Sequence, residues 1–163
     1  KGEVFEGTGH ALGATSSGQL EVSPVEGPLD DSSRRILVGV ALTTGTTPFA
    51  IERLAGSTGW ASTSLIRLAV GGIVEPREAD ALAAEVARVI RNALVEARAS
   101  EVHLAYSGPV GMAPLISRHL NSIPVVVYEV IDPMDAELAR YVPVLKFVVG
   151  GPYTQFSVLE GTG

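Results

Sequence analysis

One apolar run places the strongest constraint on the fold of this chain. Residues 36–44 read Ile-Leu-Val-Gly-Val-Ala-Leu-Thr-Thr, which is apolar and rich in β-branched side chains until its end. A strand of this kind is buried on both of its faces, and such strands occur in sheets that helices cover on both sides. The run therefore predicts a strand inside a covered sheet.

Helical patterns and further apolar runs supply the remaining parts of such a sheet. Apolar residues at spacings of three and four predict a helix over 77–98, whose opposite face is charged. Pro48 predicts the start of a short helix that ends near Leu54. Pro114 places another helix start near Gly111 or Met112, because a proline in a helix interior costs about 3 kcal/mol. Strands are predicted over 65–70, 101–107, 124–131 and 144–151.

The order of these elements predicts the fold class. Strands that alternate with helices indicate an α/β fold with a Rossmann-like, mainly parallel sheet and helices on both faces. Residues 35–163 are expected to form this single domain. Residues 1–34 are rich in glycine and are expected to form an irregular arm, with a hairpin that turns at Ser16-Ser17-Gly18.

Composition excludes several classes of function. The formal net charge of −6 repels polyanions at long range, so we expect no binding of DNA or RNA polymers. The absence of cysteine rules out disulfides and thiolate metal sites and favours a reducing compartment. No apolar run has the length of a membrane span. The sequence begins at Lys1 without a methionine, and we expect it to be the soluble part of a longer protein.

Two small-residue loops follow predicted strands. They read Thr-Thr-Gly-Thr-Thr at 43–47 and Ser-Gly-Pro-Val-Gly at 107–111. In open α/β sheets, ligands bind beyond the carboxyl ends of the strands, and glycine lets the backbone approach a ligand closely. The alternative is that each loop only turns the chain and caps a helix. Neither loop matches a dinucleotide fingerprint or a P-loop.

Catalytic and metal-binding patterns are scarce. His10, His103 and His119 show no metal-ligand spacing, and His103 is expected to be a sheet-face residue rather than a base. Asp132-Pro133 and Asp135 are expected to begin a turn and a short helix rather than a carboxylate cluster. We therefore predict no catalytic residues and no metal site.

Trp60 is the only tryptophan, and it lies in a connection rich in glycine, serine and threonine. Its ring either stacks on a base of a ligand or fills the edge of the core, and both alternatives stay open at this point.

The residues from Glu101 to Phe147 carry a family likeness. The strand and loop EVHLAYSGPVGMAPLISRHLN, followed by PVVVYEVID and YVPVLKF, resemble the C-terminal half of SAVED domains, the sensor modules of bacterial CBASS-type antiphage defence. The stretch RRILVGVALTTGTTPF looks like the first strand and loop of that family. SAVED domains are similar to CARF domains, so the resemblance implies a CARF-like fold.

The resemblance also implies a ligand. SAVED domains bind a cyclic oligonucleotide or cyclic dinucleotide that a cognate nucleotidyltransferase makes after infection, and no further cofactor is implied. Both loops chosen above on physical grounds map to the expected binding edge. The predicted ligand-binding residues are Thr43, Thr44, Gly45, Thr46, Trp60, Tyr106, Ser107, Gly108, Pro109 and Val110.

The length of the chain departs from the usual family pattern. Most SAVED proteins hold two CARF-like halves, whereas this chain has length for one half and an arm, which implies a homo-oligomer. A SAVED effector anchored in the inner membrane by an N-terminal segment, with the sensor on its cytoplasmic face, would fit this arrangement. The alternatives are an enzyme that degrades cyclic oligonucleotides, as CARF-type ring nucleases do, and a protein-binding α/β scaffold.

Substitutions in the two loops test the predicted site. We expect Ser107→Arg or Thr44→Glu to abolish the rise in melting temperature that a cyclic nucleotide produces, because each places a large side chain in the space expected for the ligand. The fold should survive both changes. Unchanged ligand affinity in both variants, measured by calorimetry, would count against this assignment.

Overall fold

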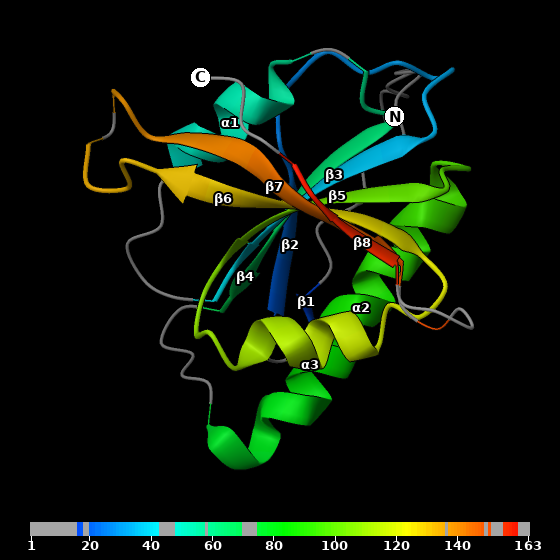
Figure 1. The fold of residues 1–163 in the computed structure, drawn as a ribbon, viewed down its shortest axis with the longest axis vertical. Helices are drawn as coiled ribbons and strands as arrows, with labels where there is room; N and C mark the ends of the chain where they lie inside the picture. The colour runs from blue at the N-terminus through cyan, green and yellow to red at the C-terminus, as the bar shows by residue number, and fades with distance from the viewer. Residues whose placement is uncertain are drawn as a thin grey trace, which may run out of the picture.

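The domain is a sheet covered on both faces by helices. The structure, a computed structural model, describes residues 16–17, 20–42, 48–57, 59–69, 75–135, 137–148, 150 and 155–159. Figure 1 shows α1 (Pro48–Ala55) on one side of the sheet and α2 (Ala79–Glu96) with α3 (Met112–Arg118) on the other. A short 3₁₀ turn, η1 (Pro76–Glu78), precedes α2. The three predicted helices are confirmed, and α3 begins at Met112 with Pro114 in its first turn.

The sheet is mixed rather than mainly parallel. In space its strands are ordered β1-β2-β4-β3-β5-β6-β7-β8, and only the pairings among β4, β3, β5 and β6 are parallel. The strands are β1 (Ser16–Ser17), β2 (Leu20–Pro24), β3 (Arg35–Ala41), β4 (Ser62–Leu68), β5 (Glu101–Ser107), β6 (Pro124–Ile131), β7 (Arg140–Val148) and β8 (Gln155–Val158).

The expectation of a mainly parallel sheet fails at the last strands for a physical reason. Only residues 132–139 connect β6 to β7, and a parallel crossover needs a dozen or more residues. The connection is therefore a hairpin, and β7 pairs antiparallel with β6. The described residues between Asp132 and Leu138 form turns there, without the short helix expected at Asp135.

Two strand boundaries also differ from the expected ones, and the first is that β7 begins at Arg140 rather than residue 144. Strand β4 begins at Ser62 rather than residue 65, because three polar residues, Ser62 to Ser64, are buried inside the sheet. The Thr63 hydroxyl donates a 2.6 Å hydrogen bond to the Val25 carbonyl, which meets the cost of burying it. An apolar pattern cannot reveal a buried strand segment built from serine and threonine.

Part of the expected N-terminal arm belongs to the sheet itself. Strand β2 pairs antiparallel with β4, and its Leu20 and Val22 side chains lie in the core. The short strand β1 pairs with the beginning of β2, which places Ser16 and Ser17 in a strand rather than in the expected turn. The sheet therefore extends further toward the N-terminus than residue 35.

Strand β3 has core on both faces. Its Ile36, Val38 and Val40 side chains pack in the cluster that contains α2 and α3, here called the α2 face. Leu37 packs on the opposite side with Ile51 and Ala55 of α1, here called the α1 face. The prediction of a strand buried on both faces is confirmed.

The connections around β3 create a switch point. After β3 the chain passes through α1 to β4, which lies beside β3 on one edge. After β4 it crosses through α2 to β5, which lies beside β3 on its other edge. The carboxyl ends of β3 and β5 are adjacent, since Ala41 pairs with Ser107 and the Leu42 amide donates to the Ser107 carbonyl at 2.8 Å. In open α/β sheets this crevice is where ligands bind.

Gly39 sets how closely α1 packs on the sheet, and it provides a stability test. A Cβ at Gly39 would lie 2.9 Å from Leu65 Cδ1 and 3.0 Å from Ile51 Cγ1. We expect Gly39→Ala to lower the free energy of unfolding by about 1–3 kcal/mol through overpacking. Urea denaturation measures this, and Gly111→Ala is the control, because a Cβ at Gly111 meets nothing within 4 Å. Equal stability of the two variants would contradict the packing argument.

Candidate functional site

The predicted site residues separate into three groups in the structure. Tyr106 to Val110 lie together at the carboxyl end of β5, beside the end of β3. The predicted residues Thr43, Thr44, Gly45 and Thr46 lie outside the described residues, between the end of β3 and the start of α1. Trp60 is found elsewhere, just before β4 begins.

The inner side of the loop after β5 is fixed by Tyr106. Its hydroxyl donates a 2.6 Å hydrogen bond to the Pro109 carbonyl. Burial raises the pKa of Tyr106 to about 12, so this donor keeps its proton at physiological pH. Gly108 allows the close approach, since a Cβ there would lie 2.6 Å from the Tyr106 hydroxyl and 3.0 Å from Leu42 Cβ. The loop is therefore held in one arrangement before any ligand binds.

The outer side of the same loop is open. Val110 is 88% exposed, and a side chain at Gly111 would meet no atom within 4 Å. The Met112 amide donates to the Pro109 carbonyl at 2.9 Å, so the turn leads directly into α3. A loop that is rigid inside and open outside can present its backbone to a ligand at the switch point of the sheet.

Trp60 occupies a core position and not the loop edge. The ring is 3% exposed, and its indole nitrogen donates to the Leu54 carbonyl at 3.0 Å. It meets His103 edge to face at 4.9 Å, and the Arg35 guanidinium lies 5.2 Å from its centroid. This placement matches the core alternative of the sequence analysis. Base stacking by Trp60 would require the ring to leave these contacts.

A buried polar network lies on the α1 face around His103. The ring is 5% exposed, with Nδ1 2.8 Å from the Tyr128 hydroxyl and Nε2 2.8 Å from a Glu101 oxygen. The other oxygen of Glu101 accepts a 2.6 Å hydrogen bond from Lys146. All four side chains have partners within the network, so His103 is built into the sheet face, as the sequence analysis expected.

Burial and neighbours shift the pKa values of this network in a consistent direction. Burial lowers the pKa of His103 below its ordinary value of 6.5, although Glu101 opposes the shift. Burial also opposes ionisation of Glu101, but hydrogen bonds from Lys146 and His103 outweigh it and lower its pKa. The folded protein therefore favours a neutral imidazole beside a carboxylate that pairs with Lys146.

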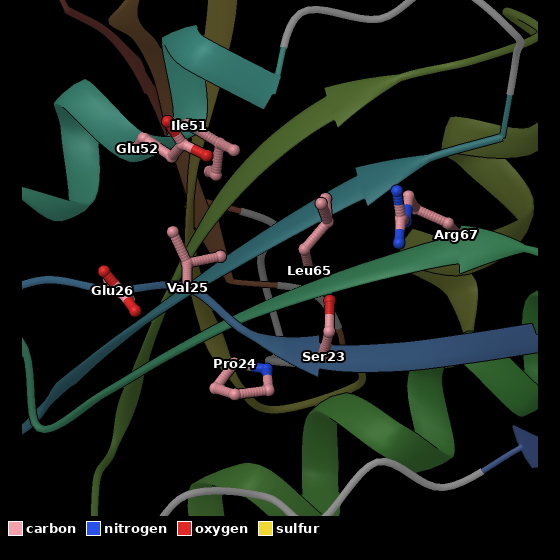
Figure 2. Close-up of a pocket in the computed structure, with 8 residues that line it drawn as sticks. All are labelled: Ser23, Pro24, Val25, Glu26, Ile51, Glu52, Leu65 and Arg67. Carbon is pink, nitrogen blue, oxygen red and sulfur yellow. The ribbon is translucent and has the colours of Figure 1, made fainter.

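A cavity of about 480 Å³ opens on the α1 face next to α1. Figure 2 shows Arg67 at one end of it and Glu26 with Glu52 at the other. No pattern in the sequence predicts this cavity, because its walls come from β2, β4 and α1, which are separate in the sequence. The available signal was Arg67, the one charged residue in the predicted strand 65–70. Its lining residues are Ser23, Pro24, Val25, Glu26, Ile51, Glu52, Leu65 and Arg67.

Within the described ranges, no three His, Cys, Asp or Glu side chains are grouped so that they could hold a metal ion. None of the helices described combines the length and the hydropathy needed to cross a bilayer.

Comparison with known proteins identifies the family. Residues 14–147 match the SAVED family, described as the SMODS-associated and fused to various effectors sensor domain. The match spans most of the chain, so the protein belongs to the SAVED family of sensor domains. No curated protein matches the sequence at a significant level.

Among the solved structures that share the fold is a bacterial receptor. It is Cap4 of Acinetobacter baumannii, a receptor containing a SAVED/CARF domain, in complex with the cyclic trinucleotide 2′3′3′-cAAA. The TM-score is 0.58 with 14% sequence identity, and the match covers 80% of this chain and 28% of Cap4. At this identity the likeness concerns the fold, and the present chain corresponds to little more than a quarter of that receptor.

The His103 network generates a prediction for the pH dependence of stability. Because the folded-state pKa of His103 lies below 6.5, its contribution is complete above about pH 6.5 and is lost as the pH falls towards the folded value. Glu101 acts in the same direction below its ordinary value of 4.5. We expect the urea concentration at the midpoint of unfolding to decrease when the pH is lowered from about 7.5 to about 5.5.

A variant at position 103 distinguishes this cause from a general effect of acid. His103→Phe should be less stable at neutral pH but should show a flatter decline over the same pH range. Identical pH dependence in the protein and in His103→Phe would show that another group controls it.

Proposed function

We propose that this domain is a non-catalytic sensor that binds a cyclic oligonucleotide or cyclic dinucleotide at the carboxyl edge of its parallel strands. The observation that carries the proposal is the loop after β5, which Tyr106 fixes from inside at the switch point between β3 and β5. Membership of the SAVED family supports the choice of ligand class. The complex of the structurally similar Cap4 with a cyclic trinucleotide supports it further.

The chemistry of the edge suits a ligand of this kind. Small residues and hydroxyls allow close approach of sugar and phosphate groups, and the open position at Gly111 leaves room for them. A rigid loop also avoids the entropic cost of ordering on binding. The predicted loop at 43–46 would complete the edge from the side of β3.

The proposal extends to how the sensor acts. A cognate nucleotidyltransferase would supply the ligand during infection, and binding would shift the association of copies of the domain and thus control an attached effector. We propose that copies of the domain associate as a homo-oligomer. We place the effector at the inner membrane, anchored by an N-terminal segment, with the sensor on the cytoplasmic side.

Binding to a panel of cyclic di- and trinucleotides tests the sensor proposal. A ligand at a hundred times its Kd stabilises a protein by about 2.7 kcal/mol, which raises Tm by roughly 5–10 °C for a domain of this size. We expect this shift with at least one panel member, and mass spectrometry should recover that ligand intact. Cleaved ligand would favour a ring nuclease, and no shift with any member would favour a protein-binding scaffold.

A pair of variants at one position locates the site within the same experiment. Gly111→Glu places a negative charge beside the expected phosphates and should weaken binding at least tenfold, because it adds repulsion without a steric clash. Gly111→Ala is the matched control and should bind within twofold of the unmodified domain. Equal affinity of both variants for the ligand would show that the ligand binds away from this loop.

A further inference from the structure

Arg67 is one of several arginines, within the described part of the chain, whose side chain has no hydrogen-bond or ion-pair partner. Most other basic side chains are engaged: for example, Arg118 pairs with Asp80, and Lys146 pairs with Glu101. Among the residues that the structure describes, Arg67 forms neither a hydrogen bond nor an ion pair, although Glu21 lies directly opposite it on β2. Its side chain is exposed and lines the cavity beside α1.

The register of the sheet places Arg67 in line with the proposed ligand edge. Arg67 pairs with Ala41 of β3, and Ala41 pairs with Ser107 of β5. These three residues form a row across adjacent strands that lie about 4.8 Å apart, so the Cα atoms of Arg67 and Ser107 are roughly 10 Å apart.

The side chains of this row point to the same face of the sheet. Side chains alternate along a strand, and Ala105, two residues before Ser107, packs on the α1 face. Gly39, two residues before Ala41, faces Ile51 of α1, and Arg67 lines the cavity together with Ile51. The small Ala41 side chain therefore lies between Arg67 and Ser107 without blocking the space above the row.

The cavity continues from Arg67 across the sheet face. Its walls include the apolar side chains Val25, Ile51 and Leu65, and Figure 2 shows Val25 and Leu65 between Arg67 and Glu26. A volume of about 480 Å³ lies within the usual range for small-molecule pockets, roughly 300–1,000 Å³. The cavity thus has a cation at the ligand edge, an apolar middle and two carboxylates at the far end.

We propose that Arg67 binds a phosphate of the cyclic oligonucleotide and that the adjoining cavity holds the base of the same nucleotide. The inference rests on the sensor function proposed above and adds a second contact region, two strands away from Ser107. A guanidinium binds phosphate with paired, charge-assisted hydrogen bonds, whereas the hydroxyls and amides of the loop after β5 carry no full positive charge. It also supplies a positive charge to a domain whose formal net charge is −6.

The two carboxylates suggest which bases the cavity accepts. Glu26 and Glu52 line its far end, and carboxylate oxygens accept hydrogen bonds from exocyclic amino groups. Adenine, guanine and cytosine carry such a group and uracil does not. We therefore expect a cyclic triadenylate to bind more tightly than a cyclic triuridylate.

Calorimetry with the tightest-binding member of the cyclic nucleotide panel tests the phosphate contact. Arg67→Ala should weaken binding roughly 10- to 100-fold, the effect of one charge-assisted hydrogen-bonded contact. Binding by this variant should also depend less on salt concentration, because one phosphate contact is lost. Arg67→Lys should recover part of the affinity. Arg91→Ala removes an exposed arginine of α2, on the other side of the sheet, and should change nothing.

Two more variants test the surroundings of Arg67. Glu21→Gln removes the opposing carboxylate and should strengthen binding, because that carboxylate repels a phosphate held by Arg67. Ser23→Trp fills the cavity from β2 and should weaken binding, with circular dichroism and the urea midpoint showing that the domain remains folded.

The possible results separate this inference from the proposed function. Loss of binding in Gly111→Glu with Arg67→Ala within twofold of the unmodified domain would overturn the role of Arg67 and leave the sensor function standing. Full affinity in Ser23→Trp, or tighter binding of cyclic triuridylate than of cyclic triadenylate, would overturn the base assignment. Absence of binding by the unmodified domain to every panel member would overturn both proposals.

Discussion

The register between β3 and its two neighbours is the constraint on which the rest of the structure depends. Strand β3 is the first of the parallel strands, and it has core on both faces, so a slip by one residue would move each of its side chains to the wrong layer. The same register aligns Arg67, Ala41 and Ser107 in one row. The packing that makes the fold stable therefore also determines which side chains meet a ligand.

The sequence was informative where one physical signal was dominant. The apolar run of β3 and the amphipathic pattern of α2 predicted these elements well. A strand buried on both faces gives a continuous apolar run, whereas a helix buried along one stripe gives apolar residues at spacings of three and four. Pro114 located the start of α3 because proline is tolerated only in the first turn. The loop after β5 could be selected because its glycines and proline follow a strand directly.

Other parts of the fold depend on partners that are remote in the sequence. The buried Ser62 to Ser64 segment of β4 is satisfied by contacts such as the bond from Thr63 to Val25, 38 residues away. The antiparallel direction of β7 follows from the short connection between β6 and β7. The length of that connection can be predicted only if the ends of both strands are predicted accurately. The cavity near Arg67 exists only once β2, β4 and α1 come together. None of these features leaves a periodic signal in the sequence.

The contact between Tyr106 and Gly108 also limits how this edge can evolve. The phenol ring fills the space into which a Cβ at position 108 would project, so any larger residue there requires a smaller one at position 106. That smaller residue would release the Pro109 carbonyl and change the course of the loop. Residues 106 and 108 should therefore change together in related domains. A different pair of residues at these positions would give the edge a different shape, suited to a different cyclic ligand.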